Sequence, residues 1–281
     1  SLTKTDITDT SNTTATVAKK KITKPTAKTG LTYTGVSQTG VNNIPSTTYA
    51  TLNSGNASGI DATSYSAVYK LVDTANTEWA DGTTANVTVS WSIAKKSLTI
   101  TWGSTTSWVY DGSSHVPSVT TPVTGVNSES VAITVSGGQT NVGSYTATAS
   151  VGTVTGGQAK AANYSISNST KAFSITNATI TYNLAITGTA TYGETLTASV
   201  TSLSPTGASL TYQWWYATSS TATSGTNISG ATSSTYTIGN VGSTSMVGKY
   251  IGVTVTASKA NYTSLTKTDI TDTSNTTATV A

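Results

Sequence analysis

The sequence predicts an all-β protein composed of several small domains in tandem. Apolar and polar residues alternate at a period of two along much of the chain. No window has a sustained helical period, and Thr and Ser together fill more than a third of the positions. Because the branched side chain of Thr disfavours helices and suits strands, both observations argue against a helical fold. A third observation, a pattern centred on Tyr that occurs three times, indicates several domains.

The alternating runs mark the expected strands in chain order. Clusters of Gly, Asn, Asp or Ser separate them, as expected for turns between strands. Each run places apolar side chains on one face and mostly hydroxyls on the other, which is typical of a half-buried strand. The runs are residues 87–93, 98–102, 131–135, 180–186, 196–200, 210–214 and 251–257.

Three Tyr residues open alternating runs after similar turns. They are Tyr65, Tyr145 and Tyr250, which follow the sequences Asp-Ala-Thr-Ser, Asn-Val-Gly-Ser and Met-Val-Gly-Lys. This is the spacing of the tyrosine corner in immunoglobulin-like sandwiches, where the phenol hydroxyl bonds to the backbone just upstream. The residue two positions later faces the core of such a sandwich, so we expect Ala67, Ala147 and Gly252 to be core residues.

The corner spacing predicts three domains and an extended rod. The corners lie 80 and 105 residues apart, and closing strands are expected at 86–93, 171–175 and 276–280. The predicted domains are therefore immunoglobulin-like β-sandwiches at residues 19–95, 96–176 and 177–281. Since linkers of a few residues leave little freedom between neighbouring domains, the tandem array is expected to be semi-rigid.

The first eighteen residues occur twice. Residues 1–18 (SLTKTDITDTSNTTATVA) are repeated without change as residues 264–281, at an offset of 263 positions. This identity predicts one period of a tandem array, in which 264–281 supply the last loop and closing strand of the third domain. Residues 1–18 are then the closing strand of a preceding repeat's third domain. They either reflect overlapping ends of a continuous array or complete a neighbouring chain by strand addition.

The composition limits the kinds of partner that are expected for the chain. The chain has no Cys and no Arg, and its formal net charge of +3 comes from scattered Lys, so no nucleic-acid partner is expected. No run approaches the roughly 18 apolar residues of a membrane span, so no membrane insertion is expected in this segment. The absence of Cys fits an extracellular bacterial protein, although it fits a cytosolic one as well.

Several motifs resemble a known class of repeats. Those of the first two predicted domains resemble bacterial immunoglobulin-like repeats of the MBG type, and they include Tyr33-Thr-Gly35, Trp79-Ala-Asp-Gly82, Trp108-Val-Tyr110-Asp-Gly112 and Ala162-Asn-Tyr164. The third domain, with Tyr212-Gln-Trp214 and Gly248-Lys-Tyr250, resembles another bacterial immunoglobulin-like class. The resemblance covers nearly the whole chain and implies stalks and spacers of giant surface adhesins. It implies a fold and brings no catalytic residues.

The sequence offers little for catalysis, so no enzyme activity, cofactor or metal site is expected. His115 is the only His, which excludes a His cluster for a metal, and the eleven carboxylates show no paired spacing. Asp81 and Asp111 precede Gly and are best explained as turn residues. Lys70 and Lys171 are weak candidates for an intramolecular isopeptide bond, which would need a buried acid beside the Lys.

The densest aromatic run is Trp214-Trp215-Tyr216. Neighbouring residues of a strand face opposite ways, so we expect Trp214 in the core and Trp215 exposed. Trp215 and Tyr216, with the loop 218–225, are thus a candidate binding or packing surface.

The leading hypothesis is a structural stalk or shaft of an extracellular bacterial fibre, whose partners are neighbouring copies joined end to end or laterally. The alternatives are a module that binds carbohydrate or a host protein, and a self-assembling filament subunit joined through residues 1–18.

Overall fold

The computed structural model of the chain describes residues 17–157, 160–271 and 279–281. Strands and their connections account for these residues, apart from the short 3-10 turns η1 (Val126–Ser128) and η2 (Ala161–Asn163). The prediction of an all-β chain is therefore confirmed. Within the described residues, no helix has the length and apolar character needed to cross a membrane.

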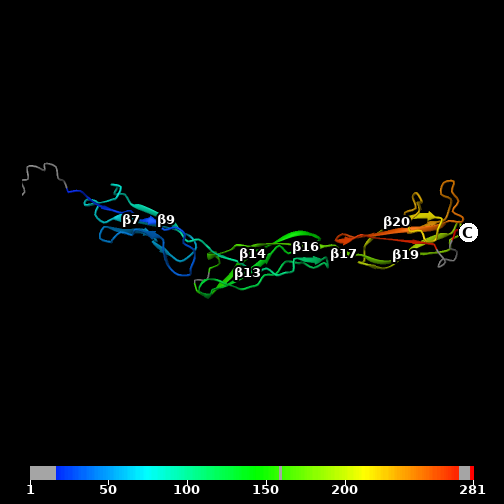
Figure 1. Cartoon of the computed structure of the whole chain (residues 1–281), viewed down its shortest axis with the longest axis horizontal. Coiled ribbons are helices and arrows are strands. Elements are labelled where there is room, and N and C mark those ends of the chain that lie inside the picture. The colour runs from blue at the N-terminus through cyan, green and yellow to red at the C-terminus, as the bar shows by residue number, and fades with distance from the viewer. Residues whose placement is uncertain (1–16, 158–159, 272–278) are drawn as a thin grey trace, which may run out of the picture. The chain divides into compact units, whose positions relative to one another are not determined.

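Residues 19–95, called the first segment below, form four small sheets. β1 pairs with β8 in parallel, while β2 with β4 and β3 with β6 form antiparallel pairs. β5, β7 and β9 form a sheet with β7 in the centre, and Figure 1 labels β7 and β9 in it. The strands are β1 (Lys20–Ile22), β2 (Thr26–Ala27), β3 (Gln38–Thr39), β4 (Val41–Asn42), β5 (Ala50–Gly55), β6 (Ser58–Gly59), β7 (Ser64–Leu71), β8 (Thr77–Trp79) and β9 (Val87–Ser92).

Residues 96–176, the second segment, form two sheets. β10 pairs with β15 in parallel, and the other sheet has five strands in the order β11-β16-β14-β13-β12. The strands are β10 (Lys96–Leu98), β11 (Ser107–Val109), β12 (Val123–Thr124), β13 (Ser130–Ser136), β14 (Gly143–Thr155), β15 (Tyr164–Ile166) and β16 (Thr170–Thr176).

The described residues of 177–281, the third segment, form three sheets. β17 pairs with β24 in parallel, and the other sheets have the orders β18-β19-β22 and β21-β20-β23-β25. The strands are β17 (Ala178–Thr179), β18 (Thr181–Thr187), β19 (Thr195–Ser204), β20 (Ser209–Ala217), β21 (Thr226–Asn227), β22 (Thr235–Thr237), β23 (Tyr250–Ser258), β24 (Tyr262–Thr263) and β25 (Leu265–Ile270).

The chain divides into two compact units, each with its own core. Unit 1 contains residues 1–103, 118–136 and 148–171, and unit 2 contains residues 104–117, 137–147 and 172–281. The core of unit 1 includes Trp79, Trp91 and Tyr164, and that of unit 2 includes Trp214 and Met246. The second segment is shared between the units, so the three-domain division of the sequence remains a prediction.

Two of the three hydroxyl-to-backbone hydrogen bonds expected of the Tyr residues are present. The Tyr65 hydroxyl donates to the Asp61 carbonyl oxygen at 2.9 Å, and the Tyr145 hydroxyl donates to the Asn141 carbonyl oxygen at 2.9 Å. Ala67 and Ala147, two residues after each Tyr, are fully buried, as expected. These bonds fix the turn at which the chain enters the long strands β7 and β14.

The expectation for Tyr250 and Gly252 is wrong in register. In the antiparallel pair of β20 and β23, Val253 lies opposite Trp214 and Gly252 lies opposite Trp215. Val253 and Trp214 belong to the core, so Gly252 is on the other face of the sheet, and Tyr250 lies on that face too. The prediction placed Tyr250 and Gly252 on the core face of β23. In the structure Ile251 and Val253 lie on that face instead.

The closing strands expected at 86–93 and 171–175 correspond to β9 and β16. For the third, residues 272–278 and 1–16 lie outside the described residues. β25, which lies inside the repeated sequence, pairs with β23, and the Val280 N–H donates to the Lys249 carbonyl oxygen at 2.9 Å. Within the repeated sequence, β25 thus extends a sheet of the third segment, and Val280 bonds to the backbone just before β23.

Candidate functional site

A set of polar contacts in unit 1 connects the turn before β7, in the first segment, to the second segment. The Ala62 N–H donates to Asn163 Oδ1 at 2.8 Å, and Asn163 Nδ2 donates to Asp61 Oδ1 at 3.1 Å. Asn163 is buried, and Asp61 and Ala62 are the turn residues of the Tyr65 corner. One short amide side chain therefore fixes a backbone group and a side chain about a hundred positions away in the sequence.

A Lys strengthens this contact. Lys160 Nζ lies 2.5 Å from Asp61 Oδ2. The hydrogen bonds from Lys160 and from Asn163 hold the pKa of the Asp61 carboxyl below its ordinary value. Asp61 is therefore ionised over the neutral range, and it accepts bonds through both oxygens from two residues that precede β15.

Beside the Asn163 contact, two Tyr residues share one buried carboxylate. The Tyr33 hydroxyl donates to Glu129 Oε1 at 2.8 Å, and the Tyr164 hydroxyl donates to Glu129 Oε2 at 2.6 Å. The two rings meet edge to face at 5.5 Å between centroids. Burial and the bond to Glu129 raise the pKa of Tyr33 to about 12, and the same causes raise the pKa of Tyr164. We call the set Tyr33, Asp61, Ala62, Glu129, Lys160, Asn163 and Tyr164 the first joint.

Unit 2 contains a second joint assembled in the same way. The Val142 N–H donates to Asn261 Oδ1 at 3.0 Å, and Asn261 Nδ2 donates to Asn141 Oδ1 at 3.0 Å. Tyr110 and Tyr262 meet edge to face at 5.5 Å between ring centroids. The set Tyr110, Asn141, Val142, Asn261 and Tyr262 therefore repeats the Asn bonds and the Tyr pair of the first joint, without its ion pair and its shared Glu.

The parallel strand pairs explain why the Asn residues are equivalent. Each joint Asn comes directly before the strand that pairs in parallel with the opening strand of its segment, with Lys96 opposite Tyr164 and Ala178 opposite Tyr262. Sequence reasoning quoted Asn163 within the motif Ala162-Asn-Tyr164 but gave no role to it or to Asn261. The signal was the recurrence of Lys-Ala-Ala-Asn-Tyr at 160–164 as Lys-Ala-Asn-Tyr at 259–262.

The expected aromatic surface is wrong for Trp215. The side chain is 2% exposed, and its Nε1 donates to the Thr254 hydroxyl oxygen at 3.1 Å. A Cβ on Gly252 would lie 2.3 Å from the Trp215 ring, and one on Gly225 would lie 2.6 Å from it. Two Gly residues thus let backbone cover the ring, while Tyr216 remains half-buried beside a hollow of about 340 Å³ that includes residues of the loop 218–225.

Other sequence candidates lie in ordinary structural settings. His115 stacks on Trp108 and its Nε2 lies 2.9 Å from Asp111 Oδ1, while Asp111 also accepts the Ser113 N–H of its own turn. Lys70 is exposed and Lys171 is half-buried. In the part of the chain that the structure describes, no three His, Asp or Glu side chains are grouped so that they would hold a metal ion.

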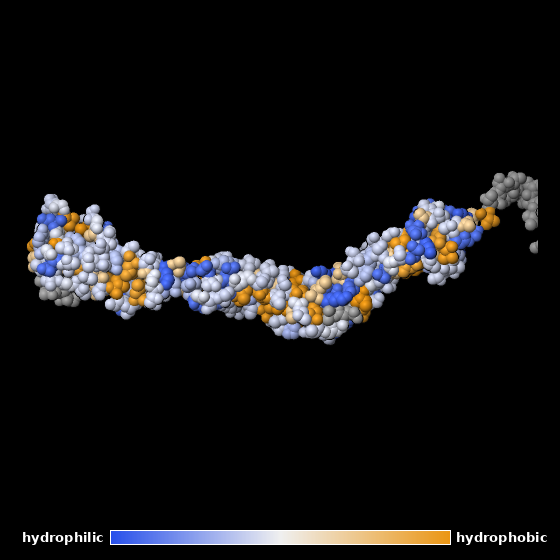
Figure 2. Space-filling model, turned by 180° about the vertical axis from the view of Figure 1, so that it is seen from behind, coloured by the Kyte–Doolittle hydropathy of each residue, from blue (hydrophilic) through white to orange (hydrophobic). Residues whose placement is uncertain are grey.

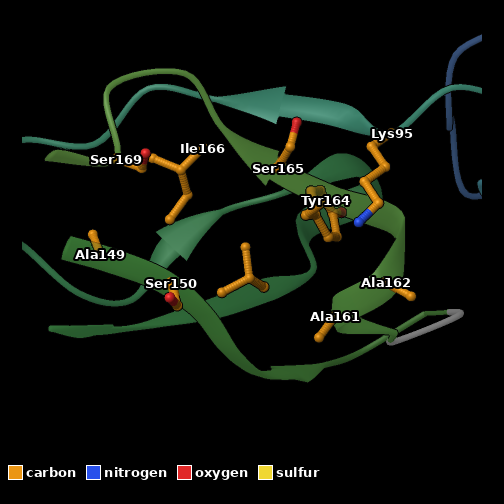
Figure 3. Close-up of a pocket in the computed structure, with 10 residues that line it drawn as sticks. Lys95, Ala149, Ser150, Ala161, Ala162, Tyr164, Ser165, Ile166 and Ser169 are labelled. Carbon is orange, nitrogen blue, oxygen red and sulfur yellow. The ribbon is translucent and has the colours of Figure 1, made fainter. Parts of the chain in front are cut away.

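A hollow of about 430 Å³ in unit 1 has no evident chemistry of its own. Figure 3 shows small Ala and Ser side chains around it, with Lys95 reaching over it beside Tyr164. Most of the face seen in Figure 2 has pale or blue colours, with hydrophobic residues in separate patches. The two joints are therefore the arrangements that carry a functional argument.

In comparisons with known proteins, no protein-family model and no curated protein matches the chain.

Proposed function

We propose that the chain is a structural, non-catalytic segment of tandem immunoglobulin-like β-sandwiches, which forms part of the stalk or shaft of an extracellular bacterial surface fibre. The observation that carries the proposal is that the same Asn bonds and Tyr pair occur at two joints. Domains that are independent of one another do not require repeated contacts between consecutive segments. A stalk needs them, because its reach depends on the stiffness of every connection.

The chemistry of the joints suits a fixed connection. Each joint Asn satisfies a turn N–H that would otherwise be solvated, and it holds a second side chain through its own amide. Edge-to-face Tyr pairs of this kind contribute about 0.5–1.5 kcal/mol beyond the area that they bury. Together these contacts restrict the rotation of one segment against the next.

Two features support the sandwich architecture and the location. The corners at Tyr65 and Tyr145 have the hydrogen bond that is typical of immunoglobulin-like domains. The resemblance to MBG-type repeats and a surface rich in hydroxyls, with few charges and no Cys, fit an extracellular fibre. Binding of carbohydrate through Trp215 has less support, because that ring is buried.

The proposal is tested by measuring how rigid the first joint is. The chain has no Cys, so spin labels on Leu52→Cys and Thr153→Cys report one distance between exposed sites of the first and second segments within unit 1. We expect a narrow distance distribution by pulsed electron paramagnetic resonance. Asn163→Ala is expected to broaden it, because the turn loses both bonds to the amide, whereas Asn86→Ala, at an exposed site, is the matched control. A broad distribution in the unmodified protein would contradict a stalk.

A further inference from the structure

The parallel strand pair of the first segment places a third Asn at the position of the joint residues. In this pair Lys20 lies opposite Thr77, as Lys96 lies opposite Tyr164. Asn76, which precedes Thr77, therefore corresponds to Asn163 and Asn261. It differs from them in its surroundings, since it is exposed and its Nδ2 donates to Asp73 Oδ2 within its own turn at 2.7 Å.

The third segment carries a third copy of the joint Tyr. The N–H of Tyr33 donates to the Ala94 carbonyl oxygen, that of Tyr110 to Thr176, and that of Tyr192 to Ala281. These bonds make Tyr192 the counterpart of Tyr33 and Tyr110. The Tyr33 ring is buried on Tyr164, whereas Tyr192 is 50% exposed.

The turn beside Tyr192 is exposed as well. The Val280 N–H donates to the Lys249 carbonyl oxygen, as the Ile93 N–H donates to Thr63. Counting back from these bonds aligns Val247 with Asp61, the residue that Asn163 holds in the first joint. Val247 is 54% exposed. The third segment thus presents an exposed face, Tyr192 and Val247, on which the described residues place nothing from another segment.

The repeated sequence connects these two exposed faces. Val17 and Val280 occupy the same position of the eighteen-residue repeat, yet Val17 is fully exposed and Val280 is 1% exposed. Val17-Ala18-Lys19-Lys20 also matches Ile93-Ala94-Lys95-Lys96, the connection that runs through the first joint. In a continuous array, a Val buried like Val280 is followed by Ala-Lys-Lys, and this sequence leads from a third segment into the next first segment.

We propose that a third joint forms between copies of this chain, in which Tyr192 and Val247 of one copy pack against Val72 and Asn76 of the next. This inference rests on the proposed function and identifies the partner at each end. Val72 is 55% exposed and directly precedes the Asp73–Asn76 turn, so it offers an apolar contact next to the amide. A hollow of about 170 Å³ beside this turn is lined by Val17, Ala18, Lys19, Lys20, Ala75 and Asn76.

Across the two faces, Asp73 and Lys249 carry opposite charges, reversed in sign relative to the first joint, and Lys19 and Lys20 also lie beside the Asn76 turn. In the first joint the corner carries Asp61 and the turn carries Lys160, three residues before Asn163. Three residues before Asn76 stands Asp73, and Lys249 stands two residues after Val247 in the third segment. Thr77 stands where the other joints have Tyr, so the third joint lacks the Tyr pair and depends on the aliphatic side chains and this charge pair.

The test uses a polypeptide of two consecutive copies, residues 1–281 followed directly by residues 19–281. Val247→Cys in the first copy and Asn76→Cys in the second create one possible disulfide, since the chain has no other Cys. The positive control is the equivalent pair in the second joint, Asn141→Cys with Asn261→Cys. The negative control pairs Val247→Cys with Val36→Cys, an exposed site near the opposite end of the first segment.

Under mild oxidation with oxidised glutathione, we expect the Val247→Cys and Asn76→Cys pair to close at a rate similar to the positive control. It is expected to close at least about tenfold faster than the negative control. Lys249→Glu in the first copy slows closure several-fold, and Asp73→Lys added in the second copy restores it. Closure no faster than in the negative control overturns the third joint.

The spin-label measurement keeps the two proposals apart. A narrow distribution across the first joint together with slow closure rejects only the contact between copies. A broad distribution across the first joint rejects the stalk, whatever the disulfide does.

Discussion

At the scale of single residues, Asp61 and Asn141 occupy equivalent positions in the two joints, and only Asp61 is a carboxylate. Asp61→Asn therefore gives the Asn163 contact of the first joint the chemistry of the Asn141–Asn261 contact in the second. We expect the variant to fold and to keep the bond from Asn163, as Asn141 keeps the bond from Asn261. It loses the ion pair to Lys160, which is largely exposed, so the cost at neutral pH is about 0.2–1 kcal/mol in the free energy of unfolding by urea titration.

The same variant carries a pH signature. Since the folded-state pKa of Asp61 is depressed, its contribution is present above the unfolded pKa of about 3.9 and is lost as the pH falls through the folded pKa. The stability difference between the two proteins should therefore shrink as the pH falls below the unfolded pKa and through the lower folded pKa. Other carboxylates titrate in both proteins and cancel in the difference. A difference that stays constant from neutral to acid pH would mean that the ion pair contributes nothing.

At the scale of elements, the pair of β20 and β23 depends on Gly252 because the Trp215 ring lies on it. Gly252→Ala should destabilise the chain by about 1–3 kcal/mol, since the new Cβ would overlap the ring and force it to shift. Trp215→Ala should cost about 3–5 kcal/mol, the usual range for a buried Trp. Both are measured by chemical denaturation.

Gly239→Ala is the matched control, because no atom lies within 4 Å of the Cβ it would add. We expect its stability to stay within about 0.5 kcal/mol of the unmodified protein. If Trp215→Ala also left the stability unchanged, the ring would be exposed in solution. It could then serve as a surface for carbohydrate binding, which would favour that alternative.

These elements also show what the sequence can and cannot predict. Alternation predicted the strands, because a half-buried strand requires it, and the corner pattern predicted the bonds of Tyr65 and Tyr145. Alternation failed at Trp215, since it defines two faces of a strand without showing which face a loop or a Gly pair will cover. The corner pattern failed at Tyr250, where the core face begins one residue later, at Ile251. The roles of the joint Asn residues were missed because their partners lie 101 and 119 positions away, where no local pattern can place them.

At the scale of the whole molecule, the first joint should make neighbouring segments depend on each other for stability. Tyr33 belongs to the first segment, but its hydroxyl donates to Glu129 of the second. Tyr33→Phe keeps the ring and removes one donor from a buried carboxylate, which costs about 1–3 kcal/mol. By native-state hydrogen exchange, we expect amides of β13 and β15 in the second segment to lose protection although the substitution is in the first.

Val89→Ala, a core truncation of β9 outside the joint, separates this coupling from simple loss of stability. It should lower protection within the first segment by about 0.5–3 kcal/mol and leave β13 and β15 less affected than Tyr33→Phe does. In a linear array the interface terms decide whether neighbours open together, so this ordering is the signature of a joint that stabilises both sides. If both substitutions affected only the first segment, each segment would be an independent bead, and the repeated Asn and Tyr contacts would align neighbours without stabilising them.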